Sequence, residues 1–281
     1  MTTYHETVLV EEVIEGLHIK NQANYIDATL GNAGHTIEIA KLGGRVLGIE
    51  RDPEMLDISK KRVEAEGIEN CRLVLGNFID IETIAKENNW LPVSGILFDL
   101  GVTNLHLKSL ERGFSFENPE AILDMRLDPN SQGVKAADLL NVLREDQMEE
   151  MFKAVLEPGA ARWITKRVAE KRNQELIKTV GDFLEICNGL KTGKTSIHEA
   201  TLPFLALRIA VNSELDNLEI ALKKAFSVLE KGGILAVISF HSGEDKIVKE
   251  FMKYSKTILP SVQELEINRR ARSAKLRIIQ K

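Results

Sequence analysis

The stretch Asp27-Ala28-Thr29-Leu30-Gly31-Asn32-Ala33-Gly34-His35 follows a short apolar run, and a helical pattern comes after it. Gly31 and Gly34 permit a tight turn and let a ligand approach the backbone closely. Glu50 stands nineteen residues beyond Gly31, at the end of the next apolar run, where a carboxylate can accept hydrogen bonds from a ribose diol. These features predict the first strand-turn-helix unit of a cofactor-binding α/β sheet.

Nicotinamide dinucleotides and S-adenosyl-L-methionine can both bind to such a turn, so the loop residues must discriminate between them. A dinucleotide loop usually reads GxGxxG, because a pyrophosphate needs open amides at the helix N-terminus. This loop reads only GxxG. The acidic Asp27 suits the cationic methionine portion and would repel a pyrophosphate. The loop therefore favours S-adenosylmethionine, with a purely structural strand-turn-helix as the alternative.

Five apolar runs alternate with helical patterns along the chain and predict a doubly wound, mainly parallel, Rossmann-like sheet. They lie at residues 25–28, 45–49, 72–75, 95–100 and 234–240. Asp52-Pro53 predicts the start of a helix that ends near Gly67. A second crossover helix is expected to begin near Ser213 and to end at Gly232-Gly233.

The connection between the fourth and fifth runs is far longer than an ordinary crossover. It contains helical spacing of apolar residues, for example at Met148 and Phe152. We therefore expect an α/β domain made of residues 1–103 and 206–281, with an α-helical subdomain inserted at residues 104–205.

Polar residues at the strand ends indicate where chemistry could occur, because the carboxyl edge of such a sheet carries the ligand crevice. Asp99 ends the fourth run and could hold the cofactor's amino group, accept a hydrogen bond from a target amine, or merely cap a turn. His241 follows the fifth run and is the second candidate for a proton acceptor. Phe78 follows the third run and is either an adenine contact or a core residue.

The composition indicates a globular protein outside the membrane. Of 281 residues, 43% are hydrophobic and 28% are charged, and no apolar run approaches the roughly 20 residues that span a bilayer. The acidic N-terminal stretch lacks the pattern of a signal peptide, and two distant cysteines indicate neither a disulfide framework nor a zinc site. We expect a cytoplasmic protein that needs no metal.

The net charge is −5, but two basic clusters oppose it. Each is either a solvated face or a surface for nucleic acid. One lies within a predicted helix and the other in the C-terminal tail; they contain Arg162, Lys166, Arg167, Lys171 and Arg172, and Arg269, Arg270, Arg272, Lys275, Arg277 and Lys281.

Ordered segments along nearly the whole chain resemble the RsmH family, also called MraW, of bacterial rRNA cytosine-N4 methyltransferases. The segments, each with the family pattern it resembles, are His5-Glu6-Thr7-Val8-Leu9 (HxPVL), residues 27–35 (DxTxGxGGH), Glu50-Arg51-Asp52-Pro53 (DRDP), Asp99-Leu100-Gly101-Val102 (DLGVSS), Arg112-Gly113-Phe114-Ser115-Phe116 (RGFSF), Leu123-Asp124-Met125-Arg126 (LDMR), residues 206–215 (ALRIxVNxEL), residues 240–245 (FHSLED) and residues 268–277 (NPRARSAKLR).

The resemblance implies transfer of a methyl group from S-adenosylmethionine to the N4 amine of a cytidine in 16S rRNA, in the decoding region of the small ribosomal subunit. The cofactor residues expected from the turn and from the resemblance are Asp27, Gly31, Ala33, Gly34, His35, Glu50, Phe78, Asp99 and His106. The expected catalytic residues are Asp99, His241 and Arg126. The expected substrate contacts are Arg112, Asp124, Arg126, Arg208, Asn212, Arg269, Arg272 and Lys275. The oligomeric state stays open between monomer and homodimer.

The chain departs from the family pattern at several positions. Ala33 replaces a glycine, Glu50 replaces a shorter aspartate, and His106 replaces a glutamine; the segments at 158–162 and 201–205 also differ. Two alternatives therefore stay open. The chain could be a paralogue that methylates another nucleic acid or a protein, or a non-catalytic module that binds S-adenosylmethionine.

Overall fold

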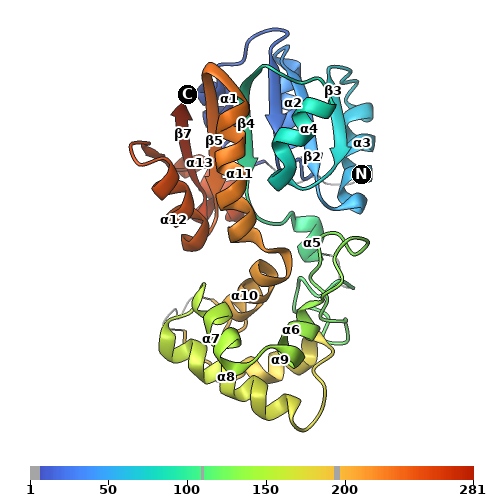
Figure 1. The fold of residues 1–281 in the computed structure, drawn as a ribbon, viewed down its shortest axis with the longest axis vertical. Helices are drawn as coiled ribbons and strands as arrows, with labels where there is room; N and C mark the ends of the chain where they lie inside the picture. The colour runs from blue at the N-terminus through green and yellow to red at the C-terminus, as the bar shows by residue number, and fades with distance from the viewer. Residues whose placement is uncertain (1–6, 109–110, 193–196) are drawn as a thin grey trace. The chain divides into compact units, whose positions relative to one another are not determined.

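The computed structural model describes residues 7–108, 111–192 and 197–281 (Figure 1). The chain divides into two compact units. The first, here called the sheet unit, contains Met1–Val102 and Leu215–Lys281, and the second, the helical unit, contains Thr103–Glu214. His5 and Glu6 of the family-like N-terminal segment lie outside the described residues, as do the side chains of Arg269 and Arg270.

The described part of the sheet unit contains a seven-stranded sheet in the order β3-β2-β1-β4-β5-β7-β6. The strands are β1 (Asn24–Asp27), β2 (Arg45–Glu50), β3 (Cys71–Leu75), β4 (Val93–Asp99), β5 (Leu229–Ser239), β6 (Thr257–Ile258) and β7 (Lys275–Gln280). The first five pair in parallel, whereas β7 pairs antiparallel with both β5 and β6. The predicted Rossmann-like class with a mainly parallel sheet and an inserted helical part is confirmed.

Helices cover both faces of the sheet. On one face α4 (Ile81–Glu87), α11 (Glu214–Val228) and α12 (Ser242–Phe251) share an apolar cluster with β1, β4 and β5. On the other face, α1 (Val10–Leu17) and α2 (Gly34–Lys41) pack against the sheet, and α3 (Pro53–Ala65) joins α2 in a smaller cluster. This double layer buries the apolar runs that predicted the strands.

Local signals set the start of α3. The Asp52 side chain caps this helix by accepting from the backbone N–H of Glu54 at 2.9 Å, and Pro53 occupies the first turn. Gly67, just beyond the helix, takes a left-handed conformation with φ of 67°. The predicted boundaries of this helix are therefore present, because capping residues act within one turn of the backbone.

The predicted end of the second crossover helix was wrong. α11 ends at Val228, and Gly232-Gly233 lies inside β5 rather than beyond the helix. The register between β4 and β5 shifts near this point, and a Cβ at Gly233 would lie 3.1 Å from the Leu229 side chain and 3.2 Å from the Ser94 carbonyl oxygen. These glycines therefore permit an irregularity in β5, where the backbone passes close to its neighbours.

The described helices of the helical unit are α5 (Asn104–Lys108), α6 (Ala136–Val142), α7 (Glu145–Lys153), α8 (Pro158–Arg172), α9 (Val180–Cys187) and α10 (Thr201–Asn212). Met148 and Phe152 are buried on α7, as their spacing predicts. The Phe183 ring contacts both Phe152, at 6.4 Å between centroids, and Phe204, at 5.2 Å. Aromatic packing thus joins α7, α9 and α10.

The helical unit ends later than the insertion expected from the sequence. Its boundary falls at Glu214 rather than at residue 205. The reason is α10, which contacts α6 and α7 and buries Phe204 and Leu207 within this unit. In the part of the chain that the structure describes, no helix has the length and apolar character needed to cross a membrane.

Candidate cofactor and active site

The turn after β1 has the left-handed backbone that the glycine pattern predicts. Gly31 has φ of 53°, and Ala33, which precedes α2, has φ of 64°. Ala33 is fully buried in the apolar cluster of Leu30 and Ile37. A residue with a Cβ is strained in this conformation, so burial of the Ala33 methyl group offsets the strain where the family pattern has glycine.

Glu50 at the end of β2 ties this turn to the neighbouring strand. Its carboxylate accepts from the backbone N–H of Gly31 at 2.9 Å and from that of Asp52 at 2.9 Å. The Ser59 hydroxyl of α3 donates to the Gly31 carbonyl oxygen. Burial raises the pKa of Glu50 to about 7. A buried carboxylate at this place can accept further hydrogen bonds from a ligand's hydroxyls.

Asp27 connects three elements at the same edge of the sheet. Its carboxylate accepts from the Thr36 hydroxyl of α2 at 2.8 Å and from the Thr29 backbone N–H at 3.3 Å. The Thr29 hydroxyl oxygen accepts in turn from the backbone N–H of Asp99 at 2.6 Å. Burial raises the pKa of Asp27 to about 6. Thr29 and Thr36 were not predicted, although both lie within or next to the glycine motif.

His35, in the first turn of α2, faces Asp99 at the end of β4. Its Nε2 lies 3.7 Å from Asp99 Oδ2. The ring is 3% exposed, and neither ring nitrogen has a hydrogen-bond partner among the described residues. Burial lowers the pKa of His35 to about 4, so the ring is neutral at physiological pH. An unpaired buried polar group is costly, and a polar ligand at this turn would supply the partner.

Phe78 follows β3 and is half-buried, with its ring edge-on to Phe98 at 5.6 Å between centroids. The ring therefore has a core partner and an accessible part.

Asp27, Gly31, His35, Glu50 and Asp99 are thus linked at the carboxyl edge of the sheet by the contacts above, as the sequence predicts.

His241 serves a structural purpose in this arrangement. It is the N-cap of α12, and its Nδ1 accepts from the backbone N–H of Glu244 at 3.4 Å. Its Nε2 lies 3.2 Å from Glu244 Oε1. Nδ1 is thus used in the cap, whereas Nε2 has no hydrogen-bond partner among the described residues. The role of His241 as a proton acceptor stays a prediction.

The C-terminal strand carries two basic residues held by one acid. Asp245 accepts from Lys275 Nζ at 2.8 Å and from Arg277 Nε at 3.0 Å. Burial acts to raise the pKa of Asp245, but the two cations hold it below its usual value. Arg272, by contrast, is exposed. Lys275 and Arg277 thus each have an ion-pair partner, whereas no ion pair of Arg272 is described.

In the helical unit, Asp124 and Arg126 bind each other. The guanidinium donates to both carboxylate oxygens at 2.7 Å, and its Nη1 donates to the carbonyl oxygens of Pro129 and Gln132. The pKa of Asp124 lies below its usual value. Burial acts to raise this pKa, but the hydrogen bonds and the charge of Arg126 lower it by more than burial raises it. The pair closes a loop rather than projecting an open charge.

Asn212, expected to contact substrate, instead organises this loop. It is fully buried; its amide donates to the Met125 and Arg208 carbonyl oxygens and accepts from the Leu127 N–H and the Gln132 side chain. These four bonds use the whole capacity of the amide. We therefore propose a structural role for Asn212 in place of a substrate contact.

The other expected residues of the helical unit also have internal partners. The Arg112 guanidinium donates to the Arg126 and Leu127 carbonyl oxygens and lies over the Phe114 ring. Arg208 forms a two-bond pair with Glu214, at 2.9 Å each. The buried His106 ring contacts Phe114 and accepts from the Thr103 N–H.

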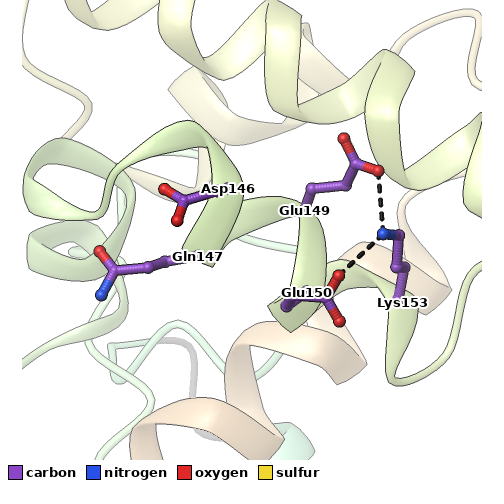
Figure 2. Close-up of a pocket in the computed structure, with 5 residues that line it drawn as sticks. All are labelled: Asp146, Gln147, Glu149, Glu150 and Lys153. Atoms are coloured by element: carbon purple, nitrogen blue, oxygen red, sulfur yellow. Dashed lines mark hydrogen bonds and ion pairs between the residues drawn. The ribbon is translucent and has the colours of Figure 1, made fainter.

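A hollow on α7 has an acidic lining (Figure 2). Lys153 bridges Glu149 and Glu150 there, at 3.0 and 2.8 Å. Arg162 of the basic cluster on α8 lies 3.6 Å from Glu149, and Lys171 pairs with Glu175 and Glu185. These acids neutralise part of the α8 cluster, which favours the solvated-face interpretation over a phosphate-binding one.

Comparison with known proteins places the chain in a family. Residues 2–257 match the model of the MraW methylase family. Ribosomal RNA small subunit methyltransferase H of Dictyoglomus thermophilum is 38% identical over 293 residues, covering 98% of this chain and 95% of that protein. The protein of the same name from Brevibacillus brevis is 38% identical over 316 residues, covering both chains completely. A solved rRNA methylase from Streptococcus thermophilus has a TM-score of 0.46 at 14% identity, covering 97% of this chain and 93% of that one. By sequence, this chain belongs to the MraW methylase family.

Proposed function

We propose that this protein transfers a methyl group from S-adenosylmethionine to the exocyclic N4 amine of a cytidine in 16S rRNA of the small ribosomal subunit, in the decoding region. The observation that carries the proposal is the linked set of Asp27, Gly31, His35, Glu50 and Asp99 at the carboxyl edge of the sheet. Relatives that cover the whole chain carry the name ribosomal RNA small subunit methyltransferase. A cytoplasmic location follows from this substrate.

The residues of the turn fit S-adenosylmethionine. The two buried acids and the unpaired His35 ring offer acceptors and a donor for a ligand with hydroxyl, amino and carboxylate groups. Glu50 would accept from the ribose hydroxyls, the turn and His35 would hold the methionine portion, and Phe78 would contact the adenine. When bound, the cofactor supplies the electrophilic methyl group.

Asp99 is the residue that we assign to the amine. A cytosine amine is a weak nucleophile because its lone pair is delocalised into the ring, so positioning must supply much of the rate, up to about 7 to 11 kcal/mol of the barrier. The Asp99 carboxylate, 27% exposed, would accept a hydrogen bond from the amine, localise the lone pair and receive the proton that is released.

Two other expected catalytic residues have partners within their own segments. His241 Nδ1 is engaged by the Glu244 amide as the cap of α12, and Arg126 is engaged by Asp124 and two carbonyl groups. The Arg126 guanidinium is used within its loop, and the capping bond fixes the orientation of the His241 ring, whose Nε2 lies beside Glu244 Oε1 at 3.2 Å. We therefore assign His241 to capping α12 and Arg126 to shaping a loop of the helical unit.

Labelling of undermodified ribosomal subunits tests the proposal. Purified protein is incubated with radiolabelled S-adenosylmethionine and small subunits that lack the modification, and the RNA is digested to nucleosides. Labelled N4-methylcytidine is the expected product. A different labelled nucleoside would indicate a paralogue with another target. Binding of the cofactor without any transfer would indicate a non-catalytic module.

A further inference from the structure

The segment Thr7-Val8-Leu9 lies just before α1 and is anchored in the core of the sheet unit. Val8 is 3% exposed and Leu9 is fully buried. Both belong to an apolar cluster with Ile39 of α2 and with Ala271 and Ala274 of the C-terminal basic segment. The segment therefore packs between the helix that follows the cofactor turn and the C-terminal part of the chain.

Thr7 occupies the space that Gly34 leaves open. A Cβ built at Gly34 would lie 1.9 Å from Thr7 Oγ1 and 3.0 Å from Thr7 Cβ. Gly34 is absent from the described residues with positive φ, so its backbone conformation alone does not demand glycine. It is the first residue of α2. Close packing by Thr7 is thus a physical reason for glycine at the start of this helix.

Leu9 is held at the other end of the segment. Its φ of 55° is left-handed, which is strained for a residue with a side chain. Its backbone N–H donates to Glu264 Oε1 at 2.8 Å. Glu264 belongs to α13 (Val262–Ile267), whose N-terminus is capped by the Ser261 side chain. The hydrogen bond and the burial of the Leu9 side chain maintain this strained backbone.

We propose that Thr7-Val8-Leu9 is a strap that positions the cofactor turn, with Thr7 packed on Gly34 and with Glu264 anchoring Leu9. The strap sets where α2 begins, and thereby the place of His35 and of the turn amides that precede it. The identity of the ligand rests on the function proposed above. Thr7 and Glu264 are positioning residues and need not contact the cofactor.

Variants that move side-chain volume from position 7 to position 34 test the strap. In Gly34→Ala the new methyl group collides with Thr7, and we expect binding of S-adenosylhomocysteine, measured by titration calorimetry, to weaken about tenfold or more. Thr7→Gly empties the same space and should weaken binding by about threefold. In the double variant the methyl group fills that space, so binding should return to within about threefold of the unchanged protein.

Amide hydrogen exchange of residues 31–37 gives a readout that needs no ligand. It is measured in the unchanged protein, in the two single variants and in the double variant. Exchange should be faster in each single variant and slower again in the double variant. A double variant as impaired as Gly34→Ala in exchange would overturn the strap. If the unchanged protein does not bind S-adenosylhomocysteine, the proposed function fails, while the exchange pattern still decides the strap. Circular dichroism identifies any variant that does not fold.

The anchor is tested separately at Glu264. Glu264→Ala removes the acceptor for the Leu9 N–H and should weaken S-adenosylhomocysteine binding by up to about tenfold, because the free energy of one hydrogen bond is the most that this anchor can contribute to positioning the turn. Glu264→Gln keeps an oxygen acceptor and should restore most of the affinity. The exposed Glu266 on the same helix provides the matched control, Glu266→Ala, which should bind normally. Unchanged affinity and an unchanged exchange rate of the Leu9 amide in Glu264→Ala would exclude the anchor.

Discussion

The backbone amide of Gly31 donates a 2.9 Å hydrogen bond to the carboxylate of Glu50, which also accepts from the amide of Asp52 at 2.9 Å. This contact joins the turn after β1 to the end of β2. The family pattern has a shorter aspartate at this position, and the longer Glu50 side chain reaches the turn amide in this chain. In the function proposed above, the carboxylate that holds the turn would also bind the cofactor.

Cofactor binding should depend on the ionisation of Glu50. Burial raises the pKa of Glu50 to about 7. Ribose hydroxyls that donate to this carboxylate favour its ionised form, so binding releases a proton and affinity rises as the pH increases through that value. Titration calorimetry with S-adenosylhomocysteine at several pH values, in buffers of different ionisation enthalpy, measures both effects. Glu50→Gln should lose this part of the pH dependence, and an unaltered profile in that variant would contradict the assignment.

Removal of the Asp99 carboxylate should stop catalysis without unfolding the protein. Asp99→Ala should lower the turnover number by at least about 100-fold, the lower range for loss of a group that accepts a proton. Circular dichroism should be unchanged, because Asp99 is partly exposed and its backbone bond to Thr29 stays. The exposed Asp57 provides the control Asp57→Ala. A turnover number near normal in Asp99→Ala would remove this residue from the mechanism.

The helical unit should lose stability when the Asn212 amide is removed. Asn212→Ala removes the side-chain donor to the buried Met125 carbonyl oxygen and to the Arg208 carbonyl oxygen, and it removes the side-chain acceptor of the Leu127 N–H. Because an unsatisfied buried group costs about 1–3 kcal/mol, we expect the free energy of unfolding to fall by at least about 2 kcal/mol in chemical denaturation. The exposed Asn130 gives a control, Asn130→Ala, with a change within about 0.5 kcal/mol. An Asn212→Ala protein as stable as that control would refute the structural role.

The contribution of Asp245 to stability should be lost in acid. Lys275 and Arg277 hold the folded-state pKa of Asp245 below its ordinary value, against the effect of burial. The folded protein therefore binds fewer protons at this site than the unfolded chain, and the stabilisation is present above the unfolded pKa of about 3.9 and disappears as the pH falls below it. Asp245→Asn should cost about 2 kcal/mol at neutral pH. Denaturation between pH 3 and 7 should show the difference shrinking in acid; a constant difference would contradict the charge pairing.

Binding of RNA should depend on Arg272. This side chain is exposed, and contact with a phosphate would release about one counterion, so Arg272→Ala should reduce the salt dependence of RNA affinity by about one unit of slope. Filter binding of a fragment of 16S rRNA at several salt concentrations measures the slope. Lys60→Ala changes another exposed charge, on α3, and should leave the slope unaltered. Equal slopes for both variants would argue against an RNA contact at Arg272.

Features that depend on neighbouring residues could be predicted from the sequence. The turn at Gly31, the acid at Glu50 and the helix start at Asp52-Pro53 are all present. Their signals are local, because backbone conformation, capping and apolar periodicity act within a few residues. The alternation of apolar runs with helical patterns was likewise sufficient to predict a mainly parallel sheet, since the strands of such a sheet are joined by crossover helices that cover both of its faces.

The partners of the polar side chains required the tertiary structure. Asn212 accepts from the Leu127 N–H, eighty-five residues away, and nothing near Asn212 in the sequence indicates that its amide is fully used. The same holds for Thr7, which packs on Gly34. Sequence alone determined which residues stand at turns and strand ends. The tertiary structure decided which of them remain available to a ligand, because each buried polar group must find a partner and the fold selects that partner from distant segments.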